Sequence, residues 1–400
     1  MNNKTTTQCQ YIRQPAFYKD FHCIGPECPT NCCHDWGNIF WQINEYEKLK
    51  NADTSDTLGA FIKFSFKRTK ENKKDGYIIN YNTAGKCPML SSGGLCLVQR
   101  ELGEEYLSET CRNYPRRFFL CGETLIQTCG ISCVHLFNTV FEDSKAMKLE
   151  LLHYNGETRT NVNDNFTESQ RMKNPAAGFN AEILDFFYDI LSDTTRSIET
   201  SLTLAFMAAG KIDEAVKKGK AGTLPSLLTA LRPALTDPKQ VKKLEGAGEN
   251  ISLKIRYITA YLSKFPTNAE IMKLIPDIVP EAEKWREGEE KFAALFPGND
   301  FGMRNAALGI FLAQRQPFTD VKLSVSDNLL FMAAEMAVIK LTGILCALDH
   351  TEDEARQNFY IAASTADRAF SHNVKLVKPV SEFMREWGVN SPAYLLGILK

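Results

Sequence analysis

The stretch that decides the fold class is Cys23-Ile-Gly-Pro-Glu-Cys28-Pro-Thr-Asn-Cys32-Cys33, where four cysteines fall among proline and glycine residues. Three later stretches continue the pattern: Cys87-Pro-Met-Leu-Ser-Ser-Gly-Gly-Leu-Cys96, Cys111-Arg-Asn-Tyr-Pro-Arg116 and Cys129-x3-Cys133. Thiolates are soft ligands that suit Zn²⁺ and iron–sulfur clusters. The turn residues beside them let the backbone fold round a metal and direct its N–H groups at sulfur. The sequence therefore predicts a metal centre built from cysteines.

The cysteines are concentrated at one end of the chain. Of the 12 cysteines, only Cys346 lies beyond residue 134. The N-terminus lacks the apolar core of a signal peptide, so we expect a cytoplasmic protein. A reducing cytosol does not keep structural disulfides, and the cysteines therefore indicate metal binding. Cys9, Cys121 and Cys346 are isolated, and we expect them to be plain structural thiols.

The bulk composition is that of a globular protein. The 400 residues are 44% hydrophobic and 24% charged, with a net charge of −1. The chain has no basic bias of the kind that nucleic-acid binding needs, so we expect no nucleic-acid partner. No run of about 18 apolar residues occurs, so we expect no transmembrane helix. The short apolar C-terminus, residues 394–400, leaves peripheral membrane association open, and a homo-oligomer is open as well.

The pattern along the chain predicts an α+β fold. We expect an irregular cysteine-rich metal-binding region at residues 1–150, a polar linker at 151–180 and a mainly α-helical bundle at 181–400. In the last region apolar residues recur at helical spacing, as from Ile183 to Leu191, and Thr351 with Glu354 fits a capping box. Short strands are expected at 38–43, 61–66 and 77–81, and a hairpin is expected from 118–120 and 125–128.

Two kinds of metal centre fit these cysteines. Zinc ribbons usually show paired C-x2-C knuckles, which this chain lacks, although His22, His34 and His135 flank the cysteines and could ligate zinc. Scattered single cysteines suit an iron–sulfur cluster better. One cluster with spare thiols and two separate centres both stay open. Trp36 and Trp41, beside the first cysteine group, either shield the centre or fill a core.

The arrangement of motifs resembles a known family. Cys87-Pro, Gly94-Leu-Cys96, Cys111-x-x-Tyr114-Pro115-Arg116 and Ser132-Cys133, together with the first cysteine group, resemble the flagellin lysine-N-methylases, the FliB family. The middle portion is also similar to zinc- or iron-chelating cysteine-cluster proteins. The resemblance covers about residues 9–137. The ligands that it implies, without a choice of four among them, are Cys23, Cys28, Cys32, Cys33, Cys87, Cys96, Cys111 and Cys133.

The resemblance implies methylation of flagellin lysine ε-amino groups, with S-adenosylmethionine as the methyl donor and a [4Fe–4S] cluster as a second cofactor. Lysine must lose its proton first, because the ammonium has no lone pair and its pKa is about 10.4. We expect Tyr114 to orient the amine and Arg116 to act with it as a catalytic residue. Arg112 and Arg117 are expected to bind the cofactors, by balancing cluster charge or holding the donor's carboxylate.

The donor pocket is not visible in the sequence. No strand is followed by the G-x-G-x-x-G stretch of nucleotide-binding folds, and no C-x3-C-x2-C radical motif occurs. Radical and direct methyl transfer therefore both stay open. A different class of function also stays open: a non-catalytic zinc- or iron-binding module that binds a metal or a partner. A visible absorption spectrum separates iron–sulfur from zinc, and methyl transfer to flagellin separates an enzyme from a binding protein.

Overall fold

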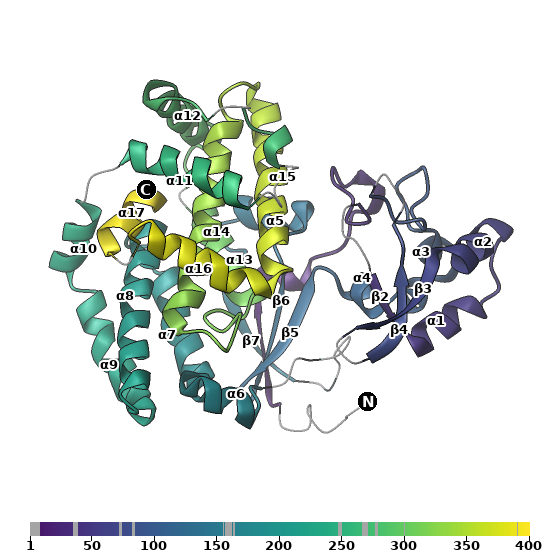
Figure 1. The fold of residues 1–400 in the computed structure, drawn as a ribbon, viewed down its shortest axis with the longest axis horizontal. Coiled ribbons are helices and arrows are strands. Elements are labelled where there is room, and N and C mark those ends of the chain that lie inside the picture. Colours follow the sequence, from purple (N-terminus) through teal and green to yellow (C-terminus); the bar gives the residue numbers. More distant parts are fainter. Residues whose placement is uncertain are drawn as a thin grey trace.

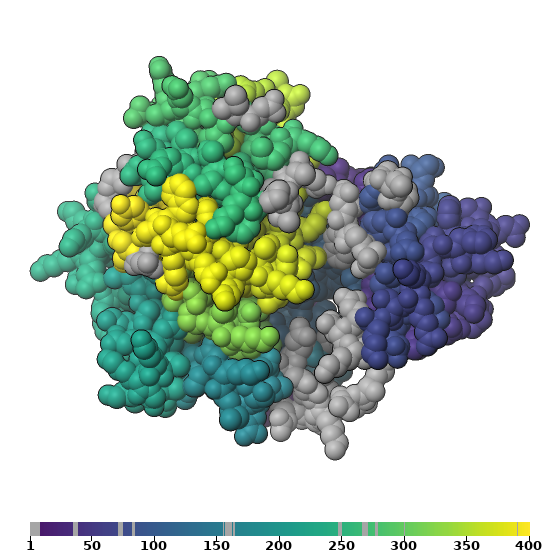
Figure 2. Space-filling model, in the orientation of Figure 1, coloured from purple at the N-terminus to yellow at the C-terminus, as the bar shows by residue number. Residues whose placement is uncertain are grey.

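The computed structural model has two lobes of unequal size (Figure 1). We call residues 39–113 the small lobe, and residues 9–22 with 114–400 the large lobe; residues 23–34 lead from one to the other. Figure 2 shows the small lobe, in purple and blue, projecting from the larger body. The structure describes residues 9–34, 39–71, 74–81, 85–154, 156, 162, 165–246, 250–265, 271–276, 279–299, 301–389 and 391–400.

The small lobe is an antiparallel sheet covered by short helices. Its strands lie in the order β2-β4-β3. Its core contains Trp41, Leu49, Leu58 and Val98. The elements are β2 (Ile39–Gln42), α1 (Ile43–Lys50), α2 (Asp56–Ser65), β3 (Phe66–Glu71), β4 (Lys74–Ile79), α3 (Leu97–Leu102) and α4 (Glu109–Asn113). Strands β2 and β4 confirm the strands expected near residues 38–43 and 77–81.

The strand expected at residues 61–66 is wrong, because these residues end helix α2. Ser55 caps this helix by accepting a hydrogen bond from the Leu58 N–H. Leu58 and Ile62, one turn apart, are buried, whereas Phe64 is 76% exposed. The alternation of aromatic residues that favoured a strand therefore reflects surface phenylalanines, and the helical spacing of the buried residues prevails.

The large lobe contains a second sheet, in the order β5-β6-β1-β7. Its strands are β1 (Tyr11–Pro15), β5 (Arg116–Cys121), β6 (Thr124–Cys129) and β7 (Leu149–His153). Strand β1 is parallel to β6 and antiparallel to β7. The pairing of β5 with β6 confirms the predicted hairpin. Its turn holds Gly122 at φ +63°, a conformation that favours glycine.

Helices make up most of the large lobe, as the sequence predicts. They are α5 (Val134–Glu142), α6 (Glu168–Lys173), α7 (Asn180–Ser192), α8 (Ile198–Lys217), α9 (Leu224–Leu235), α10 (Pro238–Glu245), α11 (Ile251–Lys264), α12 (Ala282–Leu295), α13 (Gly302–Ala313), α14 (Val325–Cys346), α15 (Glu352–Ser371), α16 (Val377–Glu386) and α17 (Pro392–Leu399). The capping box of Thr351 and Glu354 opens α15 and is confirmed.

The cysteine-rich range and the helical range share one core. Phe119, Ile126 and Phe137, from β5, β6 and α5, belong to the same buried cluster as the helices that follow residue 180. Within the expected linker, residues 168–179 form α6 and a 3-10 helix (Pro175–Phe179). The division at residues 150 and 180 therefore stays a prediction about which parts fold separately.

Helix α14 forms the centre of the large lobe. It packs against α8, α12, α13, α15, α16 and α17, and of its residues only Asp327 and Lys340 are not fully buried. Of the described helices, α14 alone is long and apolar enough to cross a membrane, but 94% of its most apolar 18-residue window is buried inside the protein. This burial is that of a core helix.

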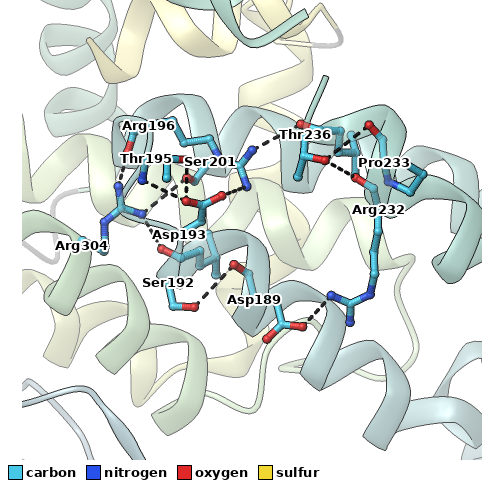
Figure 3. A network of polar contacts seen from close by, with 12 residues as sticks. Asp189, Ser192, Asp193, Thr195, Arg196, Ser201, Arg232, Pro233, Thr236 and Arg304 are labelled. Carbon is cyan, nitrogen blue, oxygen red and sulfur yellow. Dashed lines mark hydrogen bonds and ion pairs between the residues drawn. The ribbon is translucent and has the colours of Figure 1, made fainter. Parts of the chain in front are cut away.

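A buried arginine fixes the junction of α7 and α8 (Figure 3). Arg304 on α13 is 6% exposed. It donates to the backbone carbonyl of Leu191 at 2.6 Å and to that of Arg196. The Leu191 carbonyl belongs to the last turn of α7, where carbonyls lack helical partners and a cation is favoured.

We expect Arg304→Met to lower the free energy of unfolding by about 2–4 kcal/mol, because it leaves buried carbonyls without charged donors. Arg232→Met is the matched control. Arg232 pairs with Asp189 at 2.5 Å, but both side chains are about half exposed, and loss of such a pair costs less than about 1 kcal/mol. Urea unfolding of both variants measures the difference; equal losses would contradict this account of the junction.

Candidate metal centre

The eight cysteines predicted as ligands line one cavity of about 360 Å³. Cys23, Cys28, Cys32 and Cys33 come from the segment between the lobes. Cys87, Cys96 and Cys111 come from the small lobe, where they pack against its core. Cys133 comes from the large lobe and packs against the core there. The cavity therefore lies where the two lobes meet.

The remaining cysteines do not line the cavity. Cys121, Cys129 and Cys346 are buried, and Cys9 is partly exposed. Cys129 precedes Cys133 by four residues but belongs to strand β6 and faces the hydrophobic core. All the described cysteines are free thiols. Cys9, Cys121 and Cys346 thus lie away from the cavity, as expected for isolated thiols, and Cys129, although part of the Cys129-x3-Cys133 pattern, lies away from it as well.

Turns hold the first cysteine group against the small lobe. The side chain of Asn31 donates to the Gly94 carbonyl at 2.9 Å and accepts from the Cys33 N–H at 2.9 Å. The Cys87 N–H donates to the Cys33 carbonyl, also at 2.9 Å. Gly94 has φ +77° and faces Pro26 closely, so a side chain at this position would be strained.

Several of the cavity thiols lie at the N-terminal ends of helices. Cys96 and Cys133 are the N-cap residues of α3 and α5. Cys111 lies in the first turn of α4, where its own N–H is held by the Ser108 hydroxyl at 3.1 Å. Such positions favour a negative sulfur. The expectation that the turns direct N–H groups at sulfur is confirmed for Cys23, whose Sγ accepts from the Gly25 N–H at 3.4 Å.

Burial opposes this stabilisation of the thiolates. It raises the pKa of Cys87 to about 12, although the N–H groups of Met89 and Leu90 act in the other direction. Burial likewise raises the pKa of Cys133 to about 12. The pKa values of Cys28, Cys96 and Cys111 are raised for the same reason. Without a cation, these thiols hold their protons, and a metal that binds here must displace them.

Cys32 and Cys33 form a directly hydrogen-bonded pair. The bond with Cys33 lowers the pKa of Cys32, against the opposing effect of burial, and the positive charge of Arg368 lowers it further. The same bond raises the pKa of Cys33. Cys32 is therefore the cavity thiol that ionises before its neighbour.

The cavity thiols form two neighbouring groups. The charges of Cys87 and Cys96 raise the pKa of both Cys33 and Cys111; we call these four cysteines the inner group. Cys28 and Cys133 each interact with Cys23, and together these three form the outer group. Cys32 acts on members of both groups. Among the described residues, no three His, Cys, Asp or Glu side chains are arranged to hold a single metal ion.

Unpartnered polar atoms gather round the same cavity. Several buried side-chain atoms of the described residues have no hydrogen-bond partner, and five of them belong to residues that line it: Thr30 Oγ1, Trp41 Nε1, Tyr81 OH, Arg112 Nε and Arg368 Nε. Buried polar groups are normally paired, so such a concentration is typical of a site that receives a ligand. Trp41 thus both fills the small-lobe core and faces the cavity, whereas Trp36 lies outside the described residues.

The predicted tyrosine and arginines do not all reach the cavity. Tyr114, Arg112 and Arg116 line it. The Tyr114 hydroxyl donates to Ser132 Oγ at 3.2 Å, and burial raises the pKa of this tyrosine. Arg116 donates to the Phe21 carbonyl at 3.2 Å. Arg117, its neighbour on β5, is not among the lining residues, because successive side chains of a strand point to opposite faces.

Two residues of α15 and its end were missed by the sequence analysis. Arg368 lines the cavity opposite the cysteine segment. His372 lies behind Tyr114: its Nε2 is 3.5 Å from Ser132 Oγ. Burial lowers the pKa of His372 to about 3, and the charges of Arg117 and Arg368 act in the same direction, so the imidazole is neutral at pH 7. No local motif marks either residue, since both reach the site only through the fold.

Comparison with known proteins now places the chain in a family. The family model for the C-terminal domain of FliB lysine N-methylases matches residues 184–398. This protein therefore belongs to the FliB lysine N-methylase family. The matched range is the helical part of the large lobe, whereas the sequence resemblance rests on the cysteine motifs before it.

Individual relatives match over a shorter range. The chain is 28% identical over 138 residues to the lysine-N-methylase of Salmonella choleraesuis, and this match covers 34% of each chain. It is 27% identical over 139 residues to the flagellar biosynthetic protein FliU of Salmonella muenchen, covering 34% of this chain and 81% of FliU. The matches thus span about a third of the lysine-N-methylase. No solved structure matches the chain.

We expect Cys32 to react with iodoacetamide faster than Cys33 in reduced, metal-free protein at pH 7, because the thiolate is the nucleophile and Cys32 has the lower pKa. Mass spectrometry of peptides after brief labelling measures both rates. Labelling at pH 5 is the control, since protonation of Cys32 should slow its reaction. Faster reaction at Cys33, or no effect of pH on the reaction of Cys32, would contradict the assignment of the lower pKa to Cys32.

Proposed function

We propose that this protein transfers a methyl group from S-adenosylmethionine to lysine ε-amino groups of flagellin, with a [4Fe–4S] cluster held by the cavity cysteines. The observation that carries the proposal is the convergence of eight thiols on one cavity in a member of the lysine N-methylase family. Relatives named lysine-N-methylase and flagellar biosynthetic protein support the reaction and the substrate. Such an enzyme would act on flagellin before its export, so we propose that the protein works in the cytoplasm.

The donor set fits a cluster better than a single zinc ion. Zinc is bound at about 2.0–2.3 Å by ligands that contact one point, and no three candidate side chains of the described residues are arranged in that way. The thiols instead surround a space, as ligands of a several-atom cluster would. His22 lines this space and His34 does not, so the histidines do not complete a zinc site together.

The inner group is our choice for the cluster ligands. Cys87, Cys96 and Cys111 pack against the small-lobe core, and the Cys33 carbonyl accepts from the Cys87 N–H at 2.9 Å. Their N–H contacts would stabilise the charge that metal-bound thiolates carry. The outer group and Cys32 are then cavity thiols that do not ligate this cluster. With all four irons ligated by these thiolates, a bound cluster would supply an electron.

The protein's own side chains would prepare the lysine amine. In methyl transfer, the bond between the donor's sulfonium sulfur and its methyl carbon breaks as the nitrogen–carbon bond forms. The amine must therefore enter without its proton, which passes to solvent or to a neighbouring base. Tyr114, joined to Ser132 and, through it, to neutral His372, offers a polar contact in an otherwise enclosed site, where a neutral amine is favoured. Arg116 lines the same wall and disfavours an ammonium there.

We expect Cys111→Ala to lower the iron and sulfide content of anaerobically purified protein to less than about half, because one ligand in four is lost. Cys9→Ser is the matched control, since Cys9 does not line the cavity. Iron and sulfide near four atoms each per chain are expected in the wild type and in the control. Zinc without sulfide in the wild type would contradict the cluster and favour the alternative of a non-catalytic metal-binding module.

Methyl transfer itself is tested with flagellin and S-adenosylmethionine under anaerobic conditions, by mass spectrometry of flagellin peptides. Wild-type protein should add methyl groups to lysines in a donor-dependent way. Tyr114→Phe keeps the ring and removes the hydroxyl, so we expect about a tenfold or greater fall in kcat with unchanged iron content. A wild-type protein that contains the cluster but methylates no lysine would overturn the enzymatic proposal.

A further inference from the structure

A second cavity adjoins the thiol-lined one. Its volume is about 490 Å³, which is within the range that small-molecule sites occupy. Its walls are the segment 26–31, the loop 90–94 and one face of α15, to which Thr365 and Arg368 belong. The residues that line both cavities are Cys28, Thr30, Asn31, Gly94 and Arg368. The two spaces therefore share a wall and can hold parts of one ligand.

The charge of this second cavity suits an anionic group. Its lining contains Lys86, His34 and Arg368, and it contains no Asp or Glu among the described residues. Hydroxyl and amide groups of Thr30, Ser91, Ser92 and other residues complete the wall. A ligand with a carboxylate and several further polar groups would match this lining.

Arg368 lies at the junction of the two cavities. Its Nε is buried without a hydrogen-bond partner in the described part of the chain. Its charge lowers the pKa of Cys32, after the larger effect of Cys33, and that of Tyr114, against burial. The guanidinium is thus close to the thiols and the tyrosine. A planar guanidinium with a free donor binds carboxylates through two parallel hydrogen bonds, which a lysine cannot reproduce.

Figure 1 shows why the fold can supply this residue. Helix α15 lies on the side of the large lobe that faces the small lobe. It packs along the central helix α14 and also contacts α5, whose N-cap is Cys133. Thr365 and Arg368 are three residues apart and so lie on one face of α15. The guanidinium is thereby presented to the cysteine segment from a buried, well-packed helix.

We propose that the two cavities form one binding site for an amino-acid-bearing nucleoside, in which Arg368 binds the carboxylate at the junction and the second cavity receives the polar remainder. This inference rests on the proposed function, because S-adenosylmethionine is the ligand of this class that the reaction requires. It assigns to Arg368 the carboxylate role that the sequence suggested for Arg112 and Arg117.

A competing role for Arg368 is to balance the charge of Cys32 and of a bound cluster. The two roles differ in what they recognise. If Arg368 balances charge, its substitution changes the iron content and has the same effect on ligands with and without a carboxylate. Carboxylate binding affects only ligands that carry this group. A pair of probes that differ in the amino-acid portion therefore separates them.

The experiment measures binding of S-adenosylhomocysteine and of 5′-methylthioadenosine, which lacks the amino-acid portion, to full-length, iron-loaded protein by calorimetry. We expect the wild type to prefer S-adenosylhomocysteine and Arg368→Gln to lose about ten- to a hundredfold of that affinity, while binding of 5′-methylthioadenosine stays unchanged. Arg356→Gln is the matched control on the same helix. Arg356 is partly exposed beside Glu142 and lines neither cavity.

The outcomes are distinguishable. If the wild type binds S-adenosylhomocysteine and Arg368→Gln binds it equally well, the inference is overturned and the proposed function stands. If iron-loaded wild type binds neither probe, the donor assignment fails, and the inference fails with it. If Arg368→Gln loses iron, Arg368→Lys decides, because it keeps the charge but not the planar fork. If Arg368→Lys keeps its iron but prefers S-adenosylhomocysteine over 5′-methylthioadenosine less strongly than the wild type does, carboxylate binding is supported. If Arg368→Lys keeps both its iron and the full preference, Arg368 serves charge balance and the inference is overturned.

Discussion

Gathering eight thiols round one enclosed space is unfavourable unless something compensates for it. Burial removes the thiols from water, and each ionised thiolate raises the pKa of its neighbours. The cavity also holds polar atoms, including Arg112 Nε and Arg368 Nε, that have no partner among the residues the structure describes. In hydrophobic cores such features are avoided. Here they are concentrated at the junction of the lobes. This junction therefore suits a charged ligand that the thiols and the arginine side chains would both contact.

This junction depends on both lobes. The small lobe supplies Cys87, Cys96 and Cys111 from turns and short helices that pack on its core, and the segment between the lobes supplies Cys33. The large lobe supplies Cys133, Tyr114 and Arg368 from a sheet and helices anchored in an extensive core around α14. The family match lies on the helices, whereas the metal chemistry lies mostly before them. The helices therefore serve to hold the large-lobe residues of the site in place.

The local pattern of thiols beside proline and glycine indicated a metal centre, and the resemblance to the family implied which eight cysteines would serve; the structure brings these eight to one cavity. The sequence likewise predicted the β5–β6 hairpin, where Gly122 marks the turn, and α15, where Thr351 and Glu354 form the capping box. The strand expected at 61–66 failed because exposed phenylalanines imitated a buried alternation. Arg117 could not be separated from Arg116 without knowing which face of β5 is turned to the cavity.

Arg368 and His372 could not be predicted at all. Arg368 lines the cavity, and His372 contacts Ser132 beside it, because α15 packs along α14 and α5, which is a property of the tertiary structure. A single sequence gives no sign of that approach. Family resemblance based on the cysteine motifs also ends well before them. Residues that reach a site from a helix distant in the sequence can be identified only from the tertiary structure.

The central claim is that the cavity cysteines hold a metal centre at the place where the two lobes meet. Hydrogen–deuterium exchange of the iron-loaded and metal-free protein, followed by mass spectrometry, tests it most directly. The account predicts that metal slows exchange at residues 23–34, 85–96 and 109–116, with little change in α14, whose burial is independent of the site. Equal exchange of the cysteine segments in the two forms would contradict it.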